Sequence, residues 1–422
     1  MARRFWVETL GCPKNQVDSE KLTGVLVADG LVPAPTVADA DLVVVNTCAF
    51  VEEARAESIE TVLALGDARR PGAELVVTGC LAERYGTELD EALPEVDAVV
   101  GFGVPVHLGR RTSPQVPSLD LLNLPRPASV SPWAYVKVAE GCDRACGFCA
   151  IPSFRGPQRS RSVDAILAEV EALGDRLREV VLVAQDLAAF GRDQGVGRRR
   201  IVPLVQAVAE RVTRVRLLYL YPSDLTDALV DAVCATGVPY FDLSLQHVSR
   251  PLLRAMRRWG DGERFLARID DIRRRQPGAA FRSNFIVGYP GETEDDHDRL
   301  LGFLDEAQLD WCGFFAWSPE EGTAAASLPG RIDPSLVAER LAECTERQDR
   351  ITARRRDDLV GCAVEVLVDR RGVGRSYREA PEIDGLVRVP GELAVGELAT
   401  VTVDAAVGPD LVATGAAGPA IG

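Results

Sequence analysis

The sequence predicts a multidomain α/β protein with an N-terminal open parallel α/β sheet, a central partial (βα)6 barrel and a small C-terminal antiparallel β-barrel. Short apolar runs alternate with helical periodicity over the first hundred residues, and six further units of this kind follow. The last stretch holds only short β runs between Gly, Pro and Asp turns. A chain of 422 residues is long enough for several hydrophobic cores. We therefore expect domains at 1–118, 131–357 and 358–422, with a proline-rich linker at 119–130.

Three cysteines occupy equivalent places in the N-terminal domain. We expect strands there at 5–10, 42–46, 74–78 and 96–100, and helices at 17–28 and 51–65. Cys12, Cys48 and Cys80 each follow one of the first three strands after a single residue. The carboxyl ends of neighbouring parallel strands lie about 4.8 Å apart, so these thiols should converge. Three thiols can hold one polynuclear metal centre, whereas a structural zinc ion normally takes a fourth ligand. Three unrelated buried thiols are the alternative.

The central domain should resemble a barrel because six strand candidates alternate with helical segments. The expected strands are 134–138, 180–184, 215–219, 241–245, 281–287 and 312–317. The expected helices include 163–173, 262–275, 294–306 and a charged closing helix at 334–357. In such folds the chemistry takes place at the carboxyl ends of the strands.

A second group of cysteines follows the first strand of this domain. Cys142, Cys146 and Cys149 form a CxxxCxxC motif. Three thiolates within eight residues can bind three irons of a cubane cluster and leave the fourth iron open. Zinc sites usually pair two distant CxxC units, but the chain has no second pair and only His107, His247 and His297 as imidazole ligands. Cys234, Cys312, Cys344 and Cys362 have no partners in the pattern, and we interpret them as core or incidental thiols.

This motif and the βα series around it resemble the radical S-adenosylmethionine (SAM) enzymes. The resemblance implies that Cys142, Cys146 and Cys149 hold a [4Fe-4S] cluster whose open iron binds SAM, and that one-electron reduction yields methionine and a 5′-deoxyadenosyl radical. It also implies that Phe148 packs on the adenine, and that the turn containing Gly288, Pro290 and Gly291 lies near it. Thr293 and Asp296 after this turn form a predicted capping box.

Other SAM contacts are predicted at the ends of two strands. The family commonly has a Gly-Gly-Glu motif after its second strand, where this sequence has Ala184-Gln185-Asp186. We take Gln185 as the replacement. Ser244 and Gln246, at the end of the fourth strand, could face the barrel interior and bind SAM there, although satisfied core polar groups are an equal alternative.

The arrangement of the whole chain is similar to that of the methylthiotransferases. In that family a three-cysteine domain precedes the radical SAM core, and a small β-barrel called TRAM follows it. The resemblance implies that Cys12, Cys48 and Cys80 hold a second [4Fe-4S] cluster carrying the sulfur. It also implies two uses of SAM, one as methyl donor and one as radical source. No side-chain acid or base is needed, which agrees with only three histidines.

Two features concern the substrate, which in this family is a tRNA adenosine (isopentenyladenosine) or the β-carbon of an aspartate in the twelfth small-subunit ribosomal protein. From Asp357 to the end the chain has eleven acidic residues and five arginines, a net charge of −6. An acidic module suits a basic ribosomal protein, and we do not expect direct tRNA binding. The segment 374–385 and the run 149–156 are similar to the aspartate-modifying branch. Candidate substrate contacts are Glu379, Glu382 and Asp384.

Two alternative functions and two partners complete the predictions. The main alternative is a tRNA methylthiotransferase, and a non-enzymatic iron–sulfur carrier or RNA-binding adaptor is a third reading. Methylthiotransferase chemistry needs an electron donor and a sulfur source as partners.

No apolar stretch approaches 18 residues and no signal peptide is evident, so we expect a cytoplasmic protein without a membrane span.

Overall fold

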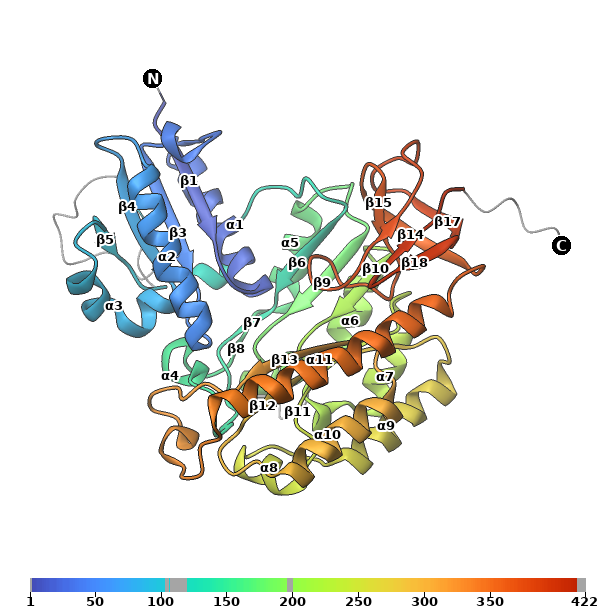
Figure 1. The fold of residues 1–422 in the computed structure, drawn as a ribbon. Helices are drawn as coiled ribbons and strands as arrows, with labels where there is room; N and C mark the ends of the chain where they lie inside the picture. The colour runs from blue at the N-terminus through green and yellow to red at the C-terminus, as the bar shows by residue number, and fades with distance from the viewer. Residues whose placement is uncertain (1, 103–105, 107–119, 196–199, 416–422) are drawn as a thin grey trace.

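The computed structural model describes residues 2–102, 106, 120–195 and 200–415 and contains two α/β units followed by a β module (Figure 1). The predicted domain boundary at 118 and the last residues of the C-terminal module, 416–422, lie outside this description. We keep the domain bounds given above as a proposal. No helix among the described residues is long and apolar enough to cross a bilayer.

The N-terminal domain is a five-stranded parallel sheet in the order β2-β1-β3-β4-β5. Its strands are β1 (Arg4–Thr9), β2 (Val32–Pro33), β3 (Leu42–Thr47), β4 (Glu74–Gly79) and β5 (Ala98–Val99). Its helices are α1 (Pro13–Ala28), α2 (Glu52–Ala68) and α3 (Cys80–Ala92), with a 3-10 turn at Val37–Asp39. Thr9 is level with Asn46, and Asn46 with Thr78, so three strands end together.

Helix α3 was not expected, and it changes the setting of Cys80. Gly79 has a φ of +95°, which lets the chain leave β4 and enter the helix without a loop. Cys80 is consequently the first residue of α3, while Cys12 is the N-cap of α1. Two of the three predicted ligands therefore lie at helix N-termini, which favour negative charge.

The central domain confirms the partial barrel. All six expected strands are present and parallel: β6 (Trp133–Lys137), β9 (Glu179–Val183), β10 (Arg214–Leu217), β11 (Tyr240–Gln246), β12 (Ala280–Val287) and β13 (Trp311–Ala316). They form two three-stranded sheets, β10-β9-β6 and β11-β12-β13. A single bridge between Leu220 and Leu243 joins the two sheets, so the strands run around the barrel in chain order.

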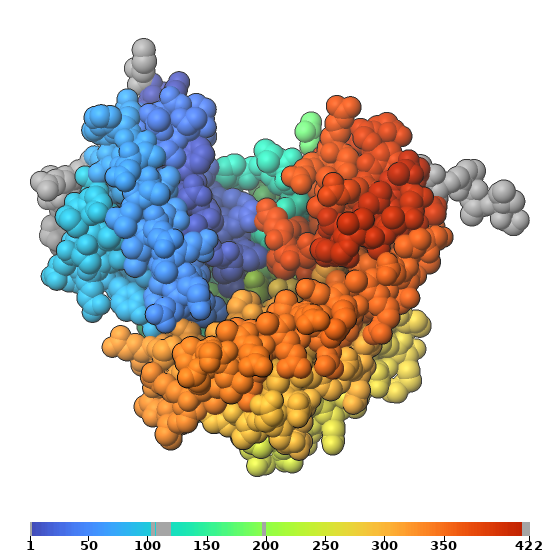
Figure 2. Space-filling model, in the orientation of Figure 1, coloured from blue at the N-terminus to red at the C-terminus, as the bar shows by residue number. Residues whose placement is uncertain are grey.

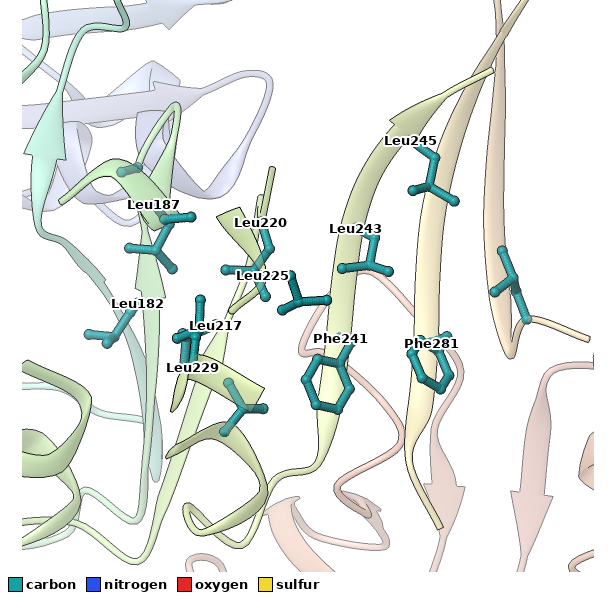
Figure 3. Packing of buried hydrophobic residues seen from close by; sticks show 14 of the residues in the cluster. Leu182, Leu187, Leu217, Leu220, Leu225, Leu229, Phe241, Leu243, Leu245 and Phe281 are labelled. Carbon is teal, nitrogen blue, oxygen red and sulfur yellow. The ribbon is translucent and has the colours of Figure 1, made fainter. Parts of the chain in front are cut away.

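The helices cover the outer face of this barrel. They are α5 (Val163–Ala172), α6 (Ile201–Ala209), α7 (Asp227–Cys234), α8 (Arg250–Ala255), α9 (Gly262–Arg275), α10 (Glu294–Ala307) and α11 (Pro334–Asp357). Phe241, Leu243 and Leu245 of β11 pack into the cluster under these helices (Figure 3). Alternation along the strand then directs Asp242 and Ser244 to the opposite, inner face. Smaller elements are α4 (Ile151–Arg155) and the hairpin of β7 (Ala139–Glu140) with β8 (Arg159–Ser160).

The described part of the predicted linker, 120–130, is packed rather than loose. Its 3-10 turn, Leu121–Asn123, buries Leu121 and Leu122, and the ammonium of Lys21 in α1 donates to the carbonyl of Leu122. Arg126 is also buried, with its Nε 3.1 Å from Glu169 of α5. These contacts tie α1 of the first domain to the second.

The C-terminal module is a six-stranded curled sheet in the order β17-β14-β15-β16-β19-β18. Its strands are β14 (Ala363–Arg370), β15 (Val373–Arg375), β16 (Val387–Arg388), β17 (Leu398–Thr402), β18 (Ala405–Val407) and β19 (Asp410–Val412). The expected antiparallel pairing holds except between β16 and β19, which are parallel. This exception follows from topology, because the chain crosses β17 and β18 before it returns beside β16.

The segment 374–385 connects β15 to β16 and fills the inner face of the barrel near the first residues of its strands. Ala380 packs with Tyr135, Tyr240 and Trp311 in one buried cluster. The hydroxyl of Tyr135 donates to the carbonyl of Pro381 at 2.7 Å, and the indole of Trp311 donates to the carbonyl of Arg378 at 2.7 Å. The segment therefore anchors the C-terminal module to the barrel.

Candidate functional site

The three strand-end cysteines of the N-terminal domain lie close to one another. A Cβ built on Gly11 would lie 2.9 Å from Cβ and Sγ of Cys48, so the loop that carries Cys12 touches Cys48 directly. Sγ of Cys80 is 3.7 Å from Oδ1 of Asn15, whose amide donates to the carbonyls of Leu10 and Thr47 at 2.9 and 3.0 Å. Asn15 thus links the ends of all three strands.

The electrostatics of these thiols reflect this closeness. Burial, with the neighbouring Cys12 and Cys80, raises the pKa of Cys48 to about 12. Burial also raises the pKa of Cys80, although the charge of Arg155 opposes it. For Cys12 burial acts in the same direction, but Lys14, two backbone amides and Arg155 outweigh it and lower the pKa. The three thiols repel one another as anions, so together they suit a metal centre that neutralises them.

The CxxxCxxC cysteines form a second set at the mouth of the barrel. Burial comes first among the causes that raise the pKa of Cys142 to about 11 and of Cys149 to about 12, and each feels the charge of Cys146. The amide of Arg144 donates to Sγ of Cys142 at 3.4 Å, and Arg258 donates to Sγ of Cys146 at 3.4 Å. Both sulfurs therefore already have donors that would stabilise thiolates.

All ten cysteines are free. No three His, Cys, Asp or Glu side chains in the described ranges surround one point as ligands of a single ion would. A polynuclear cluster has a different requirement, since each thiolate binds its own iron. Two sets of three free, neighbouring thiols with hydrogen-bond donors fit two such clusters.

Arg155 joins the two cysteine sets, a role that no pattern in the sequence indicates. It ends α4, which begins two residues after Cys149, yet its Nη2 donates to Sγ of Cys80 at 3.0 Å and to Oδ1 of Asn15 at 2.8 Å. Nη1 lies 3.1 Å from Asp18 and 3.0 Å from Glu140. The Arg155 guanidinium is buried. It links Cys80 of the N-terminal set to the helix that follows Cys149 of the second set.

Around Arg155 lies a buried ionic network between the two domains. Lys137 of β6 contacts Asp18 of α1 and lies 2.6 Å from Glu140. Burial acts against ionisation of Glu140, but Arg155 and Lys137 outweigh it and hold the pKa of that carboxyl well below its usual range. The mouth of the barrel therefore meets the N-terminal domain through fully paired charges.

Gln185, the predicted replacement for the missing motif, lies in this network. Its Nε2 donates to Glu140 at 2.6 Å, while its Oε1 is buried and has no hydrogen-bond partner among the described residues. In the same part of the chain Oδ1 of the adjacent Asp186 is also buried and without a hydrogen-bond partner, and its other oxygen pairs with Arg144 at 2.5 Å. Two unsatisfied acceptors beside Cys142 suit a cationic amino group, such as that of SAM. Of these two residues, only Gln185 was predicted from the sequence.

The remaining SAM candidates occupy different surroundings. Phe148 is half-buried and packs against the hydrophobic cluster between the barrel strands and their helices. The carbonyl of Ser244 accepts a hydrogen bond from Arg258. Gln246 adopts a φ of +73° at the end of β11. Arg258 therefore contacts both Cys146, a predicted cluster ligand, and Ser244 near the end of β11.

The turn with Gly288, Pro290 and Gly291 is fixed by contacts with Glu292 and with Val337 of α11. The amide of Gly288 donates to Glu292 at 2.7 Å, and a Cβ on Gly288 would lie 2.5 Å from Val337 of α11. The predicted capping box of Thr293 and Asp296 is confirmed at the start of α10. The glycine is thus required by packing against α11.

Two of the three candidate substrate contacts, Glu379 and Asp384, are paired with other residues of the protein. Glu379 is buried and binds Arg356 together with the amide and hydroxyl of Ser376. Asp384 accepts from the hydroxyl of Tyr240 at 2.6 Å, and burial raises its pKa to about 6. Both carboxylates anchor the segment 374–385 to the barrel. Only Glu382 is exposed.

Comparison with known proteins identifies the class. The chain matches "Uncharacterized protein family UPF0004" over residues 4–101, the radical SAM superfamily over 136–304 and the TRAM domain over 360–415. The chain also has some similarity to the methyltransferase TsrM from Kitasatospora setae, with 16% identity, a TM-score of 0.48 and 75% of each chain covered. The matches to the three family models, together with the two cysteine sets, define a radical SAM enzyme with an N-terminal cysteine domain and a TRAM module.

Full-length relatives identify the family within that class. The chain is 41% identical over 415 residues to the ribosomal protein uS12 methylthiotransferase RimO of Moorella thermoacetica, a match that covers 94% of this chain and 96% of that protein. Proteins of the same name from Myxococcus xanthus and Anaeromyxobacter sp. are 40% and 41% identical, covering 97% and 98% of this chain and 91% and 93% of theirs. The chain belongs to the RimO family of radical SAM methylthiotransferases.

Proposed function

We propose that this enzyme attaches a methylthio group to the β-carbon of an aspartate in uS12, the twelfth small-subunit ribosomal protein. Full-length relatives at about 40% identity carry the name of this activity. The structural observation that carries the proposal is the contact between Arg155 and Cys80, because it brings the two cysteine sets to one interface.

We assign Cys142, Cys146 and Cys149 to the cluster that binds SAM, and Cys12, Cys48 and Cys80 to the cluster that holds the sulfur. The former would supply the electron that cleaves SAM into methionine and a 5′-deoxyadenosyl radical, and the latter would supply the sulfur. Helix α4, five residues and about 8 Å long, leads from Cys149 to Arg155, whose side chain contacts Cys80 of the other set. A radical formed at one set would therefore act beside the other.

The side chains of this interface would orient SAM and exclude water. Gln185 and Asp186 offer buried acceptors to the amino group of SAM. Ser244 and Gln246, near the end of β11, are our candidates for further contacts with SAM. The turn at Gly288, Pro290 and Gly291 and the ring of Phe148 are our candidates for the adenine. The network of Lys137, Asp18, Glu140 and Arg155 is fully paired, so it holds the interface closed without offering a free acid or base.

The surface charge of the C-terminal module supports a basic protein substrate. In the described module from Asp357 onward, seven carboxylate residues are exposed against three arginines. Glu382 is one of them, and the charge of Glu20 in α1 contributes, after burial, to the raised pKa of Glu382. The surface is hollowed between the blue N-terminal domain and the red C-terminal module (Figure 2). We infer that an arginine- and lysine-rich segment of uS12 enters from this side, in the cytoplasm.

The mass of uS12 in a strain that lacks this gene tests the proposal. We expect uS12 from this strain to be lighter by one methylthio group less the hydrogen atom that it replaces, and the purified enzyme with SAM, a reductant and a sulfide source to restore the mass. An unchanged mass in the deletion strain would overturn the assignment. Modification of tRNA by the same preparation would support the alternative, a tRNA adenosine methylthiotransferase, which the acidic module disfavours.

A further inference from the structure

An arginine-rich surface lies beside the second cysteine set and has no part in the site described above. Residues 250–260 contain four arginines and no acidic residue, in a chain whose net charge is −15. Arg250, Arg254 and Arg257 are exposed, and none of them forms an ion pair with a residue that the structure describes. An unpaired cluster of like charge on an acidic protein points to a binding partner of opposite charge.

This segment contacts the cysteine loop directly. The amide of Gly147, between Cys146 and Cys149, donates to the carbonyl of Met256 at 2.8 Å. A Cβ on Gly147 would lie 3.0 Å from the carbonyl oxygen of Ala255, so the end of α8 and the loop are in contact. Arg258 completes the connection by donating to Sγ of Cys146. The positive surface therefore begins at a predicted ligand of the SAM-binding cluster.

Aromatic side chains extend the connection to the surface. Two guanidinium groups lie over the ring of Tyr221. That of Arg144 is 3.8 Å and that of Arg258 is 4.2 Å from the ring centroid. Its hydroxyl accepts from the amide of Trp259 at 3.3 Å. Trp259 itself is 43% exposed, unusually open for so large an apolar side chain. Exposed tryptophan among arginines is typical of protein interfaces.

We propose that the surface of Arg250, Arg254, Arg257 and Trp259, which we call the arginine surface, is the docking site of an acidic one-electron carrier protein. The inference rests on the radical SAM chemistry of the proposed function, which consumes one electron for each SAM cleaved. In the step that this surface serves, the carrier loses one electron and the cluster gains one. No bond forms or breaks there and no proton moves.

The position of the arginine surface favours a redox protein over RNA. Arginines also bind phosphates, so their charge alone suits either partner. A carrier must approach the cluster it reduces, and this surface adjoins Gly147 and Cys146. Helix α8 lies at the lower edge of the molecule, away from the N-terminal domain and the TRAM module that border the proposed substrate entrance (Figure 1).

Charge reversal with a matched control tests the docking site. The test variant is Arg250→Glu/Arg254→Glu/Arg257→Glu. The control is Arg3→Glu/Arg370→Glu/Arg371→Glu, which changes the net charge equally at exposed arginines elsewhere. Each full-length protein is titrated with oxidised flavodoxin, an acidic carrier, before and after cluster loading. Formation of 5′-deoxyadenosine is then measured with flavodoxin hydroquinone and, separately, with dithionite.

For the test variant we expect flavodoxin binding and flavodoxin-driven 5′-deoxyadenosine formation to fall roughly tenfold at low ionic strength. Dithionite-driven formation should stay within about twofold, and the control should behave as the parent does. Added salt should weaken the parent's binding and narrow the difference. Equal losses in the control, or undiminished flavodoxin binding, would overturn the proposal. The proposal would also be overturned if the test variant, but not the control, lost binding to a short fluorescent RNA, because that result would assign the arginine surface to nucleic acid. Absence of 5′-deoxyadenosine with dithionite in the parent would instead count against the proposed function.

Discussion

Nη2 of Arg155 lies 3.0 Å from Sγ of Cys80, so a residue six positions after Cys149 touches a cysteine of the other set. The same guanidinium satisfies Asp18 and Glu140, both at the domain interface. A single buried cation therefore both joins the two domains and donates to a predicted ligand sulfur.

Replacing Arg155 by alanine should destabilise this interface by roughly 3–5 kcal/mol, because among the described residues it leaves Lys137 as the one cation paired with the carboxylates of Asp18 and Glu140. It should also make the reduction potential of the N-terminal cluster more negative, since a positive donor to its sulfur is lost. Arg155→Lys keeps the charge and should show the smaller effect on both. Thermal unfolding and potentiometric EPR provide the measurements. Identical potentials in all three proteins would contradict the predicted donation to Cys80.

Cys12, Cys48 or Cys80 changed to alanine should preserve SAM cleavage and abolish sulfur insertion. Each variant should hold about half of the parent's iron, because only one of two equal clusters is lost. Alanine at Cys142, Cys146 or Cys149 should stop both reactions. Assays of 5′-deoxyadenosine, uS12 mass and iron content distinguish these cases. Normal methylthiolation by a Cys80→Ala protein would refute the assignment of the N-terminal set.

Gly11→Ala should disrupt the N-terminal cluster specifically. A Cβ at Gly11 would come within 2.9 Å of Cys48, and the backbone there has a φ of +95°. Gly30→Ala is the matched control, because Gly30 has a φ of +85° with nothing within 4 Å. Both substitutions should cost about 1–2 kcal/mol of backbone strain, but only Gly11→Ala should lose iron. Iron analysis after reconstitution decides, and equal iron in the two proteins would contradict the packing argument.

Glu382→Lys should weaken association with uS12 severalfold at low ionic strength, because Glu382 is exposed on the acidic module. The effect should fade as salt is added. Glu379→Gln is the contrasting variant: it should leave the salt dependence of binding unchanged and destabilise the fold by roughly 3 kcal/mol, since Arg356 loses its buried partner. Binding titrations and thermal unfolding check both. If Glu379→Gln alone changed binding, our placement of the two carboxylates would fail.

His247 should make the central domain sensitive to acid. Its ring is buried, and Nδ1 accepts from the amide of Ser249 at 3.0 Å. Burial lowers the pKa of His247 from 6.5 to about 4 despite the nearby Asp296. The unfolded chain therefore binds the proton more readily between these pH values, so stability falls as pH drops from 6.5 to 4, by up to about 3 kcal/mol. His247→Asn, which retains an acceptor, should flatten this pH dependence of the melting temperature. An unchanged slope would show that other groups cause it.

Much of the fold followed from local pattern. All six barrel strands were predicted, and helices α9 and α11 have the predicted bounds, because their periodicity and caps are written in neighbouring residues. Helix α3 was missed because it starts without a loop at Gly79, and β2, β15 and β18 were too short to leave a pattern. The parallel pairing of β16 with β19 depends on chain return, which no local signal records.

The sequence by itself determined the chemistry of this protein. Strand-end spacing and the CxxxCxxC motif are local features, and they sorted six of ten cysteines into two sets. Only the tertiary structure decided how those sets meet, because Arg155 is 140 residues from Asn15 and 137 from Asp18 in the chain and contacts them through domain packing. It also decided which carboxylates of the segment 374–385 are available. Burial and pairing are properties of the folded surroundings, so Glu379 and Asp384 became anchors while Glu382 stayed in solvent.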